Sequence, residues 1–141
     1  MVEGKTALDV GSSTGGFTQV LLYEGAEKIT SVDVGTDQLH SSLRSDARIS
    51  LLEQTDIRDI SSRLKDSFDL VVVDVAFISL SKIIKDIESV ARKEGDIILL
   101  YKPQFEVGIQ NISKNGVVKK ETDTKRILGR FLKSLEKSSL Y

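Results

Sequence analysis

The stretch Ala7-Leu8-Asp9-Val10-Gly11-Ser12-Ser13-Thr14-Gly15-Gly16-Phe17-Thr18 decides the fold of this chain. It begins as a short apolar strand, passes through a glycine-rich turn and enters a helix whose predicted apolar face holds Phe17, Val20 and Leu21. Glycines let backbone N–H groups approach a ligand closely, and the first turn of a helix offers N–H donors without helical partners. The stretch therefore predicts a nucleotide-sized pocket at the end of a strand.

An acidic residue, Asp33, ends the next apolar run and lies 22 positions after Gly11. A carboxylate about 20 residues beyond such a turn holds ribose hydroxyls in dinucleotide-type sites. The dinucleotide pattern G-x-G-x-x-G has its middle glycine at position 13, which is Ser13 here. Because that glycine lets a pyrophosphate lie against the backbone, Ser13 argues against NAD and FAD.

Asp9 adds a carboxylate near the floor of the predicted pocket. A carboxylate there repels a phosphate but suits an ammonium or a sulfonium group, and S-adenosylmethionine carries both. We therefore predict S-adenosylmethionine as the cofactor. The alternative is that Gly11, Gly15 and Gly16 only make a tight strand-to-helix turn and that Asp9 is a hydrogen-bonded turn residue.

Length and composition limit the classes of protein to which this chain can belong. A chain of 141 residues that is 40% hydrophobic suits a single domain, residues 1–141, with its own core. With no cysteine and one histidine, His40, we expect neither disulfides nor a metal site. The longest apolar runs, residues 70–78 and 97–101, are too short to span a bilayer, and the amino terminus lacks an apolar signal core. We expect a cytoplasmic protein with no membrane partner, and the sequence predicts no particular oligomeric state.

Charge is distributed unevenly along the chain. The net charge is −1, but the first 101 residues hold 17 acidic and 11 basic residues, a net −6, whereas the rest hold 4 acidic and 9 basic residues, a net +5. The basic excess can form a footprint for a phosphate backbone, or it can be a solvated helix face, the interpretation we favour for residues 133–137. These basic residues are Lys114, Lys119, Lys120, Lys125, Arg126, Arg130, Lys133 and Lys137.

Short apolar runs alternate with helical patterns. We predict strands at residues 6–10, 28–33, 49–53, 70–74 and 96–101, a helix from Leu80 to Val90 capped by Ser79 or Ser81, and a last helix at about 122–137. Strands as uniformly apolar as residues 70–73 are buried on both faces, which predicts an α/β fold with a doubly wound parallel sheet. Residues 105–120 are predicted to be a loop without its own structure, over the same edge as the pocket.

Asp74 and Lys102 follow the fourth and fifth predicted strands. Ligands bind across the carboxyl ends of such strands, so both side chains are expected in one cleft. Pro103 favours an extended Lys102, and a lysine held by a carboxylate can orient a substrate hydroxyl and help to remove its proton. The alternative is a structural ion pair.

With these residues in place, the sequence resembles the hemolysin A (TlyA) family of ribosomal RNA 2′-O-methyltransferases, which are related to the FtsJ-like ribose methyltransferases. The matching segments run through nearly the whole chain. They are residues 7–18, Val32-Asp33-Val34-Gly35 with Gln38-Leu39, residues 69–80, and Lys102-Pro103-Gln104-Phe105-Glu106.

The resemblance implies a Rossmann-like sheet of the class I methyltransferase type, and the transfer of a methyl group from S-adenosylmethionine to a ribose 2′-hydroxyl of ribosomal RNA or ribosomal subunits, with no metal. It implies a catalytic Lys-Asp-Lys-Glu set, of which Asp74 and Lys102 match the middle two. The implied cofactor site comprises Asp9, Gly11, Ser12, Ser13, Thr14, Gly15, Gly16, Phe17, Asp33, Val34, Asp56, Ile57 and Asp74, with Asp56 and Ile57 beside the adenine.

The sequence also departs from the family pattern. The first lysine of the set precedes the first strand in the family, and Lys5 is at the wrong place to replace it. The final glutamate lies beyond the last helix, and an RNA-binding S4-like domain normally comes first. We therefore expect a truncated core that binds the cofactor but methylates RNA negligibly alone. The alternatives are a cofactor- or RNA-binding module without activity and a pore-forming hemolysin, which no spanning segment supports.

Overall fold

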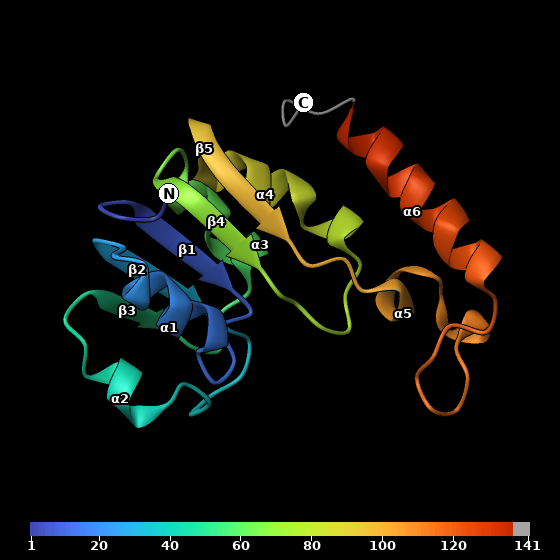
Figure 1. Ribbon diagram of the computed structural model, residues 1–141, viewed down its shortest axis with the longest axis horizontal. Coiled ribbons are helices and arrows are strands. Elements are labelled where there is room, and N and C mark those ends of the chain that lie inside the picture. Colours follow the sequence, from blue (N-terminus) through green and yellow to red (C-terminus); the bar gives the residue numbers. More distant parts are fainter. Residues whose placement is uncertain (137–141) are drawn as a thin grey trace.

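The computed structural model describes residues 1–136, apart from the side chains at positions 122 and 123. Its centre is a five-stranded sheet in which every pair of neighbouring strands is parallel, in the order β3-β2-β1-β4-β5 (Figure 1). The predicted parallel sheet is thereby confirmed. The strands are β1 (Thr6–Val10), β2 (Lys28–Val32), β3 (Ile49–Leu52), β4 (Phe68–Val73) and β5 (Ala91–Leu99).

Strand β5 differs from its prediction, because it begins at Ala91 rather than at residue 96. Phe68 pairs with Ala91 and Leu70 pairs with Asp96, so four residues of β5 bulge out opposite one residue of β4. The bulge holds charged side chains, and Arg92 donates to Asp69 Oδ1 at 2.5 Å. Sequence periodicity missed this part of the strand because the bulge interrupts the alternation of apolar residues.

Helices cover both faces of the sheet. Helix α1 (Gly16–Tyr23) packs on one face; α3 (Ile57–Ile60), the 3-10 helix η1 (Ser61–Leu64), α4 (Ile84–Val90) and the end of α6 (Glu121–Leu135) pack on the other. The helix predicted from Leu80 is divided into the 3-10 helix η2 (Leu80–Lys82) and α4, and Ser79 caps it by accepting from Ser81 N at 3.2 Å. Lys137, the predicted end of the last helix, lies outside the described residues.

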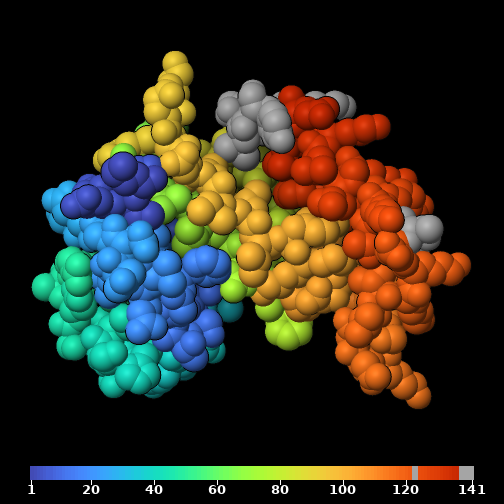
Figure 2. All heavy atoms as spheres, viewed as in Figure 1, coloured from blue at the N-terminus to red at the C-terminus, as the bar shows by residue number. Residues whose placement is uncertain are grey.

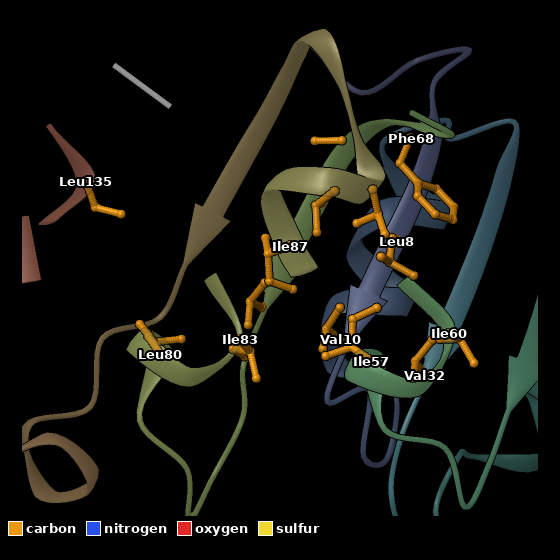
Figure 3. Packing of buried hydrophobic residues seen from close by; sticks show 14 of the residues in the cluster. Leu8, Val10, Val32, Ile57, Ile60, Phe68, Leu80, Ile83, Ile87 and Leu135 are labelled. Atoms are coloured by element: carbon orange, nitrogen blue, oxygen red, sulfur yellow. The ribbon is translucent and has the colours of Figure 1, made fainter. Parts of the chain in front are cut away.

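Successive strand residues enter two separate cores. In β1, Ala7 belongs to the cluster under α1, whereas Leu8 belongs to the cluster under α3 and α4. In β4 the same alternation separates Leu70 and Val72 from Val71 and Val73, and all of these side chains are buried. Figure 3 shows the second cluster between the sheet and the helices. Burial on both faces explains the uniformly apolar run in β4.

Two sequence predictions about local structure are wrong. Val20 of α1 is 54% exposed, and Thr18 is buried in its place because its hydroxyl bonds to groups inside the sheet. The segment 105–120 carries structure of its own. It contains the end of α5 (Pro103–Glu106), the 3-10 helix η3 (Ile109–Asn111) and an antiparallel bridge between Ile112 and Val118.

Candidate cofactor and catalytic site

A cleft of about 360 Å³ opens at the carboxyl ends of β1, β2 and β4, where the strand order reverses direction. Its volume falls within the range of small-molecule sites. Of the predicted cofactor residues, seven line it: Gly11, Ser13, Asp33, Val34, Asp56, Ile57 and Asp74. Sequence reasoning missed the others, which end β1 and β2, lie in the loops after strands or precede α4: Val10, Val32, Gln38, Thr55, Val75, Ala76, Phe77, Ile78 and Ile83.

Gly11 brings the glycine turn against the end of β4. Its φ is +81°, and a Cβ at this position would lie 2.3 Å from the backbone oxygen of Asp74. The Asp74 N–H in turn donates to Val10 O at 3.0 Å. Only glycine allows both this backbone conformation and this close approach. The turn and the Asp74 backbone therefore form one wall of the cleft.

Asp33 holds the turn from the β2 side. Its Oδ2 accepts from Ser13 N at 2.8 Å and its Oδ1 accepts from Gly35 N at 2.7 Å. Each carboxylate oxygen can accept more than one hydrogen bond, so Asp33 retains acceptor capacity for a ligand in the cleft. Ser13 adopts a φ of +49°, in the left-handed region. The predicted ribose acid thus also shapes the site.

The loops after β2 and β3 form the opposite end of the cleft. Thr55 N donates to Asp33 O, and Gln54 N donates to Gly35 O, both at 2.9 Å. Asp56 caps α3 and pairs with Arg58, and the hydrogen bonds from this arginine hold the pKa of Asp56 below its ordinary value. Backbone hydrogen bonds therefore fix both loops, and the loop after β3 leads to Asp56 and Ile57, the predicted adenine-side residues.

Asp9 lies beneath the cleft rather than in its wall. The side chain is fully buried, and its Oδ2 accepts from Thr18 Oγ1 at 2.7 Å, which in turn lies 2.8 Å from Ser31 Oγ. The other oxygen, Oδ1, has no hydrogen-bond partner within residues 1–136. Burial raises the pKa of Asp9 to about 6, the charges of Asp74 and Asp33 add to the rise, and the Thr18 hydrogen bonds oppose it.

Five other predicted residues also lie outside the cleft wall: Ser12, Thr14, Gly15, Gly16 and Phe17. Ser12 is buried and its N–H donates to Val32 O at 3.1 Å, while Thr14 O accepts from His40 N at 3.0 Å. Gly15 faces Leu43, and Phe17 packs on the core under α1. Ser12, Thr14 and Gly15 belong to the turn, and Gly16 and Phe17 begin α1, so none of the five lines the cleft.

Asp74 and Lys102 meet as predicted, in an ion pair between Lys102 Nζ and Asp74 Oδ1. Apart from this ion pair, Asp74 Oδ1 has no hydrogen-bond partner within residues 1–136. Their side chains keep 32% and 25% of their surface exposed. Lys102 is extended, with φ −115° and ψ 100°, and Pro103 begins α5, as the sequence predicts. Of the two, only Asp74 lines the cleft, and Lys102 reaches its mouth through the pair with Asp74, where both side chains remain available to a substrate.

Phe77 is the residue that sequence reasoning missed most completely. It lines the cleft, is 91% exposed and has a φ of +62°. Its ring lies 5.1 Å from that of Phe105, with an interplanar angle of 55°. A bulky residue in the left-handed region stores about 1–3 kcal/mol of strain, which the surroundings must offset. In Figure 2 the yellow-green loop after β4 projects from the lower edge of the molecule.

Lys5 and the segment after α5 do not enter the cleft. Lys5 Nζ pairs with Asp96 at 2.7 Å, at the amino ends of the strands, in agreement with the view that Lys5 cannot replace a catalytic lysine. No residue that lines the cleft comes from residues 105–120. Among residues 1–136, no helix is long and apolar enough to cross a membrane.

The sheet order and a cleft at the strand reversal define a Rossmann-like α/β protein, whose ligands bind at such a reversal. The family model for FtsJ-like methyltransferases matches residues 1–139, and the chain belongs to this family. The fold is that of S-adenosylmethionine-dependent methyltransferases, so the class implies a methyl-donor cofactor.

The chain is similar to two ribosomal RNA methyltransferases. It is 47% identical to the 23S rRNA (cytidine-2′-O)-methyltransferase TlyA of Campylobacter jejuni, over 99% of this chain and 58% of that protein. It is 45% identical to the 16S/23S rRNA (cytidine-2′-O)-methyltransferase TlyA of Mycobacterium tuberculosis, over 83% of this chain and 44% of that protein. The chain thus spans about half the length of these curated relatives.

A solved structure of a protein described as a hemolysin, from Lactococcus lactis, superimposes with a TM-score of 0.86 at 37% identity. The superposition covers 94% of this chain and 64% of that one. These matches confirm the resemblance to the hemolysin A family that the motifs predicted.

Proposed function

We propose that this chain is the catalytic domain, residues 1–141, of an enzyme that transfers a methyl group from S-adenosylmethionine to a ribose 2′-hydroxyl of ribosomal RNA, in the cytoplasm. The ion pair of Asp74 and Lys102 at the mouth of the cleft carries the proposal. The names of the relatives support the choice of ribosomal RNA and of the 2′-oxygen.

The cleft suits a cationic nucleoside cofactor. Asp33 and Asp74 line it, and Asp9 lies beneath with an oxygen that accepts no hydrogen bond. Three carboxylates around one site favour a ligand with ammonium and sulfonium groups and repel a pyrophosphate. We assign the ribose hydroxyls to Asp33, and the adenine to the wall of Val34, Asp56 and Ile57. When bound, S-adenosylmethionine supplies an activated methyl group on its sulfonium.

The remaining chemistry requires alignment of the ribose oxygen and management of one proton. Lys102 Nζ is a donor at the mouth of the cleft, where it can contact the 2′-oxygen and orient it. Asp74 fixes the direction of Lys102 and balances its charge. Phe77 presents an exposed aromatic face beside this pair, on which an unstacked RNA base can pack.

A tritiated-methyl transfer assay on unmodified ribosomal subunits tests the proposal. In this assay the chain replaces the matching domain of a full-length relative. We expect label in the RNA at a ribose 2′-O position, and loss of that label when the chain carries Lys102→Ala. Label on a base or on a ribosomal protein would contradict the assignment of the acceptor. The 141-residue chain assayed alone tests whether Asp74 and Lys102 suffice for methyl transfer without the first lysine and the final glutamate of the implied catalytic set.

Calorimetry with S-adenosylmethionine, S-adenosylhomocysteine and NAD tests the cofactor separately. We expect the first two ligands to bind and NAD to bind far more weakly, because Ser13 and the three carboxylates disfavour a pyrophosphate. Cofactor binding without transfer by any longer form would favour the alternative of a binding module. Leakage of dye from liposomes would favour a pore-forming hemolysin.

A further inference from the structure

The segment after β5 contacts the loop after β4 at three successive points. Lys102 pairs with Asp74, the ring of Phe105 packs on that of Phe77, and Glu106 binds the residues at which the loop ends. Lys102 precedes α5 with an extended backbone, whereas Phe105 and Glu106 lie in α5. The segment 102–106 therefore follows the whole loop 74–79.

Glu106 uses both carboxylate oxygens in this contact. Its Oε2 accepts from Ser79 Oγ at 2.5 Å, and its Oε1 accepts from Leu80 N at 2.8 Å. Ser79 and Leu80 mark the point where the loop enters η2, and Leu80 is fixed in the core. The other end of the loop is fixed at Asp74, whose N–H donates to Val10 O. Glu106 thus secures the end of the loop that lies away from the glycine turn.

The loop between these two anchors needs such support. Phe77, in its middle, combines a left-handed backbone with an almost fully exposed ring. A bulky residue keeps this conformation only where the surrounding contacts determine it, because both the strain and the exposure favour a different arrangement. The Phe105 ring supplies one such contact, and Glu106 is the next residue of α5.

We propose that Glu106 is a positioning residue, which holds the loop 74–79 so that Phe77 and Asp74 face the acceptor ribose beside Lys102. The role of Glu106 in placing the acceptor ribose rests on the function proposed above. Its role in holding the loop 74–79 does not depend on methyl transfer. Glu106 contacts neither the ion pair nor the wall of the cleft in the contacts described. Loop 74–79 forms part of the cleft wall, but the glycine turn and Asp33 hold the rest of it, so the loss of Glu106 should change the placement of RNA more than the affinity for the cofactor.

The chain contains no tryptophan, so Phe77→Trp provides a single fluorescent reporter in the loop. In this background we compare Glu106→Ala, Glu106→Gln and Glu27→Ala, the last being a control at an exposed glutamate before β2. The glutamine can keep both contacts, with its oxygen accepting from Leu80 N and its amide donating to Ser79 Oγ. We expect lower tryptophan anisotropy and stronger acrylamide quenching for Glu106→Ala, and values near the parent for the other two.

Two results would overturn the proposal: parental anisotropy and quenching in Glu106→Ala, or an equal fall of anisotropy in the alanine and glutamine variants. If Glu106→Ala does not fold, Ser79→Ala takes its place, since it removes the 2.5 Å contact, and a partial fall of anisotropy is expected. None of these measurements needs activity, so they stand apart from the test of methyl transfer.

Activity supplies the second readout, in the natural Phe77 background of an active longer form. For Glu106→Ala we expect kcat with ribosomal subunits to fall about 10- to 100-fold, because displacing a reacting group by about 1 Å can cost about 100-fold in rate. Glu106→Gln should restore most of it, and in Glu106→Ala the affinity for S-adenosylmethionine should fall by a much smaller factor than kcat. An equal loss of cofactor affinity would show a general structural role and overturn the assignment.

Discussion

Replacing Asp9 with asparagine should reveal a buried carboxylate that resists ionisation. Asp9 is fully buried, and burial raises its pKa from 3.8 to about 6. A difference of about two pKa units corresponds to about 3 kcal/mol, at 1.36 kcal/mol for each unit. Ionised Asp9 should therefore destabilise the folded chain by about this amount relative to protonated Asp9.

The direction of the pH dependence follows from the raised pKa. Between about pH 4 and pH 6 the folded chain keeps the Asp9 proton while the unfolded chain has released it, so the free energy of unfolding falls as pH rises and is level above that window. Asp9→Asn cannot ionise. The variant should thus gain about 3 kcal/mol relative to the natural chain between pH 4 and pH 7.

Urea unfolding at pH 4, 5, 6 and 7, followed by far-UV circular dichroism, measures this difference. Carboxylates with a lowered pKa, such as those of Asp46, Asp56, Asp69 and Asp96, are present in both proteins and cancel in the comparison. If the asparagine amide itself changes the free energy of unfolding, it does so equally at every pH. A difference between the two proteins that stays constant from pH 4 to pH 7 would refute the reasoning.

Three further substitutions test the cleft. Lys102→Ala in an active longer form should abolish methyl transfer with little change in melting temperature or cofactor affinity; a variant that melts early yet still transfers methyl groups would make the ion pair structural. Asp33→Ala should weaken S-adenosylmethionine binding by about 1.5–3 kcal/mol, as expected for hydrogen bonds to a charged acceptor. It should also lower the melting temperature, because Ser13 N loses its acceptor. Unchanged binding by calorimetry would contradict the assignment of Asp33 to the cofactor site. Gly11→Ala should destabilise the folded chain far more than Gly4→Ala. Both glycines have a positive φ, but a Cβ at position 11 would lie 2.3 Å from a backbone atom, while Gly4 faces open space. Equal losses of the free energy of unfolding in urea would show that φ alone matters.

The parts of the site that the sequence predicts correctly are those set by strand topology. Asp33, Asp74 and Lys102 each follow an apolar strand, and the carboxyl ends of parallel strands meet at one edge of the sheet. Their approximate placement therefore needs no knowledge of distant contacts. The same reasoning does not show how Asp9 is held beneath the cleft, because periodicity does not reveal that Thr18 turns inward to bind it.

Phe77 could not be predicted in the same way. Its exposure and left-handed backbone belong to a loop whose other end is held by Glu106, 26 residues beyond Leu80. Short-range patterns contain no information about such a pair. The same limit applies to β5, whose first half is recognised only from its pairing with Phe68.

The bulge in β5 also bears on how the chain behaves at high concentration. In the described part of the chain β5 lies at the edge of the sheet, and an edge strand can pair with the strand of another molecule. Residues 92–95 interrupt the ladder with charged side chains, which discourages such pairing along that half. The regular half, which includes the half-exposed Ile98, lacks this protection. Self-association by strand addition should therefore begin at the end of β5 nearest Lys102, where it would compete directly with the proposed RNA substrate.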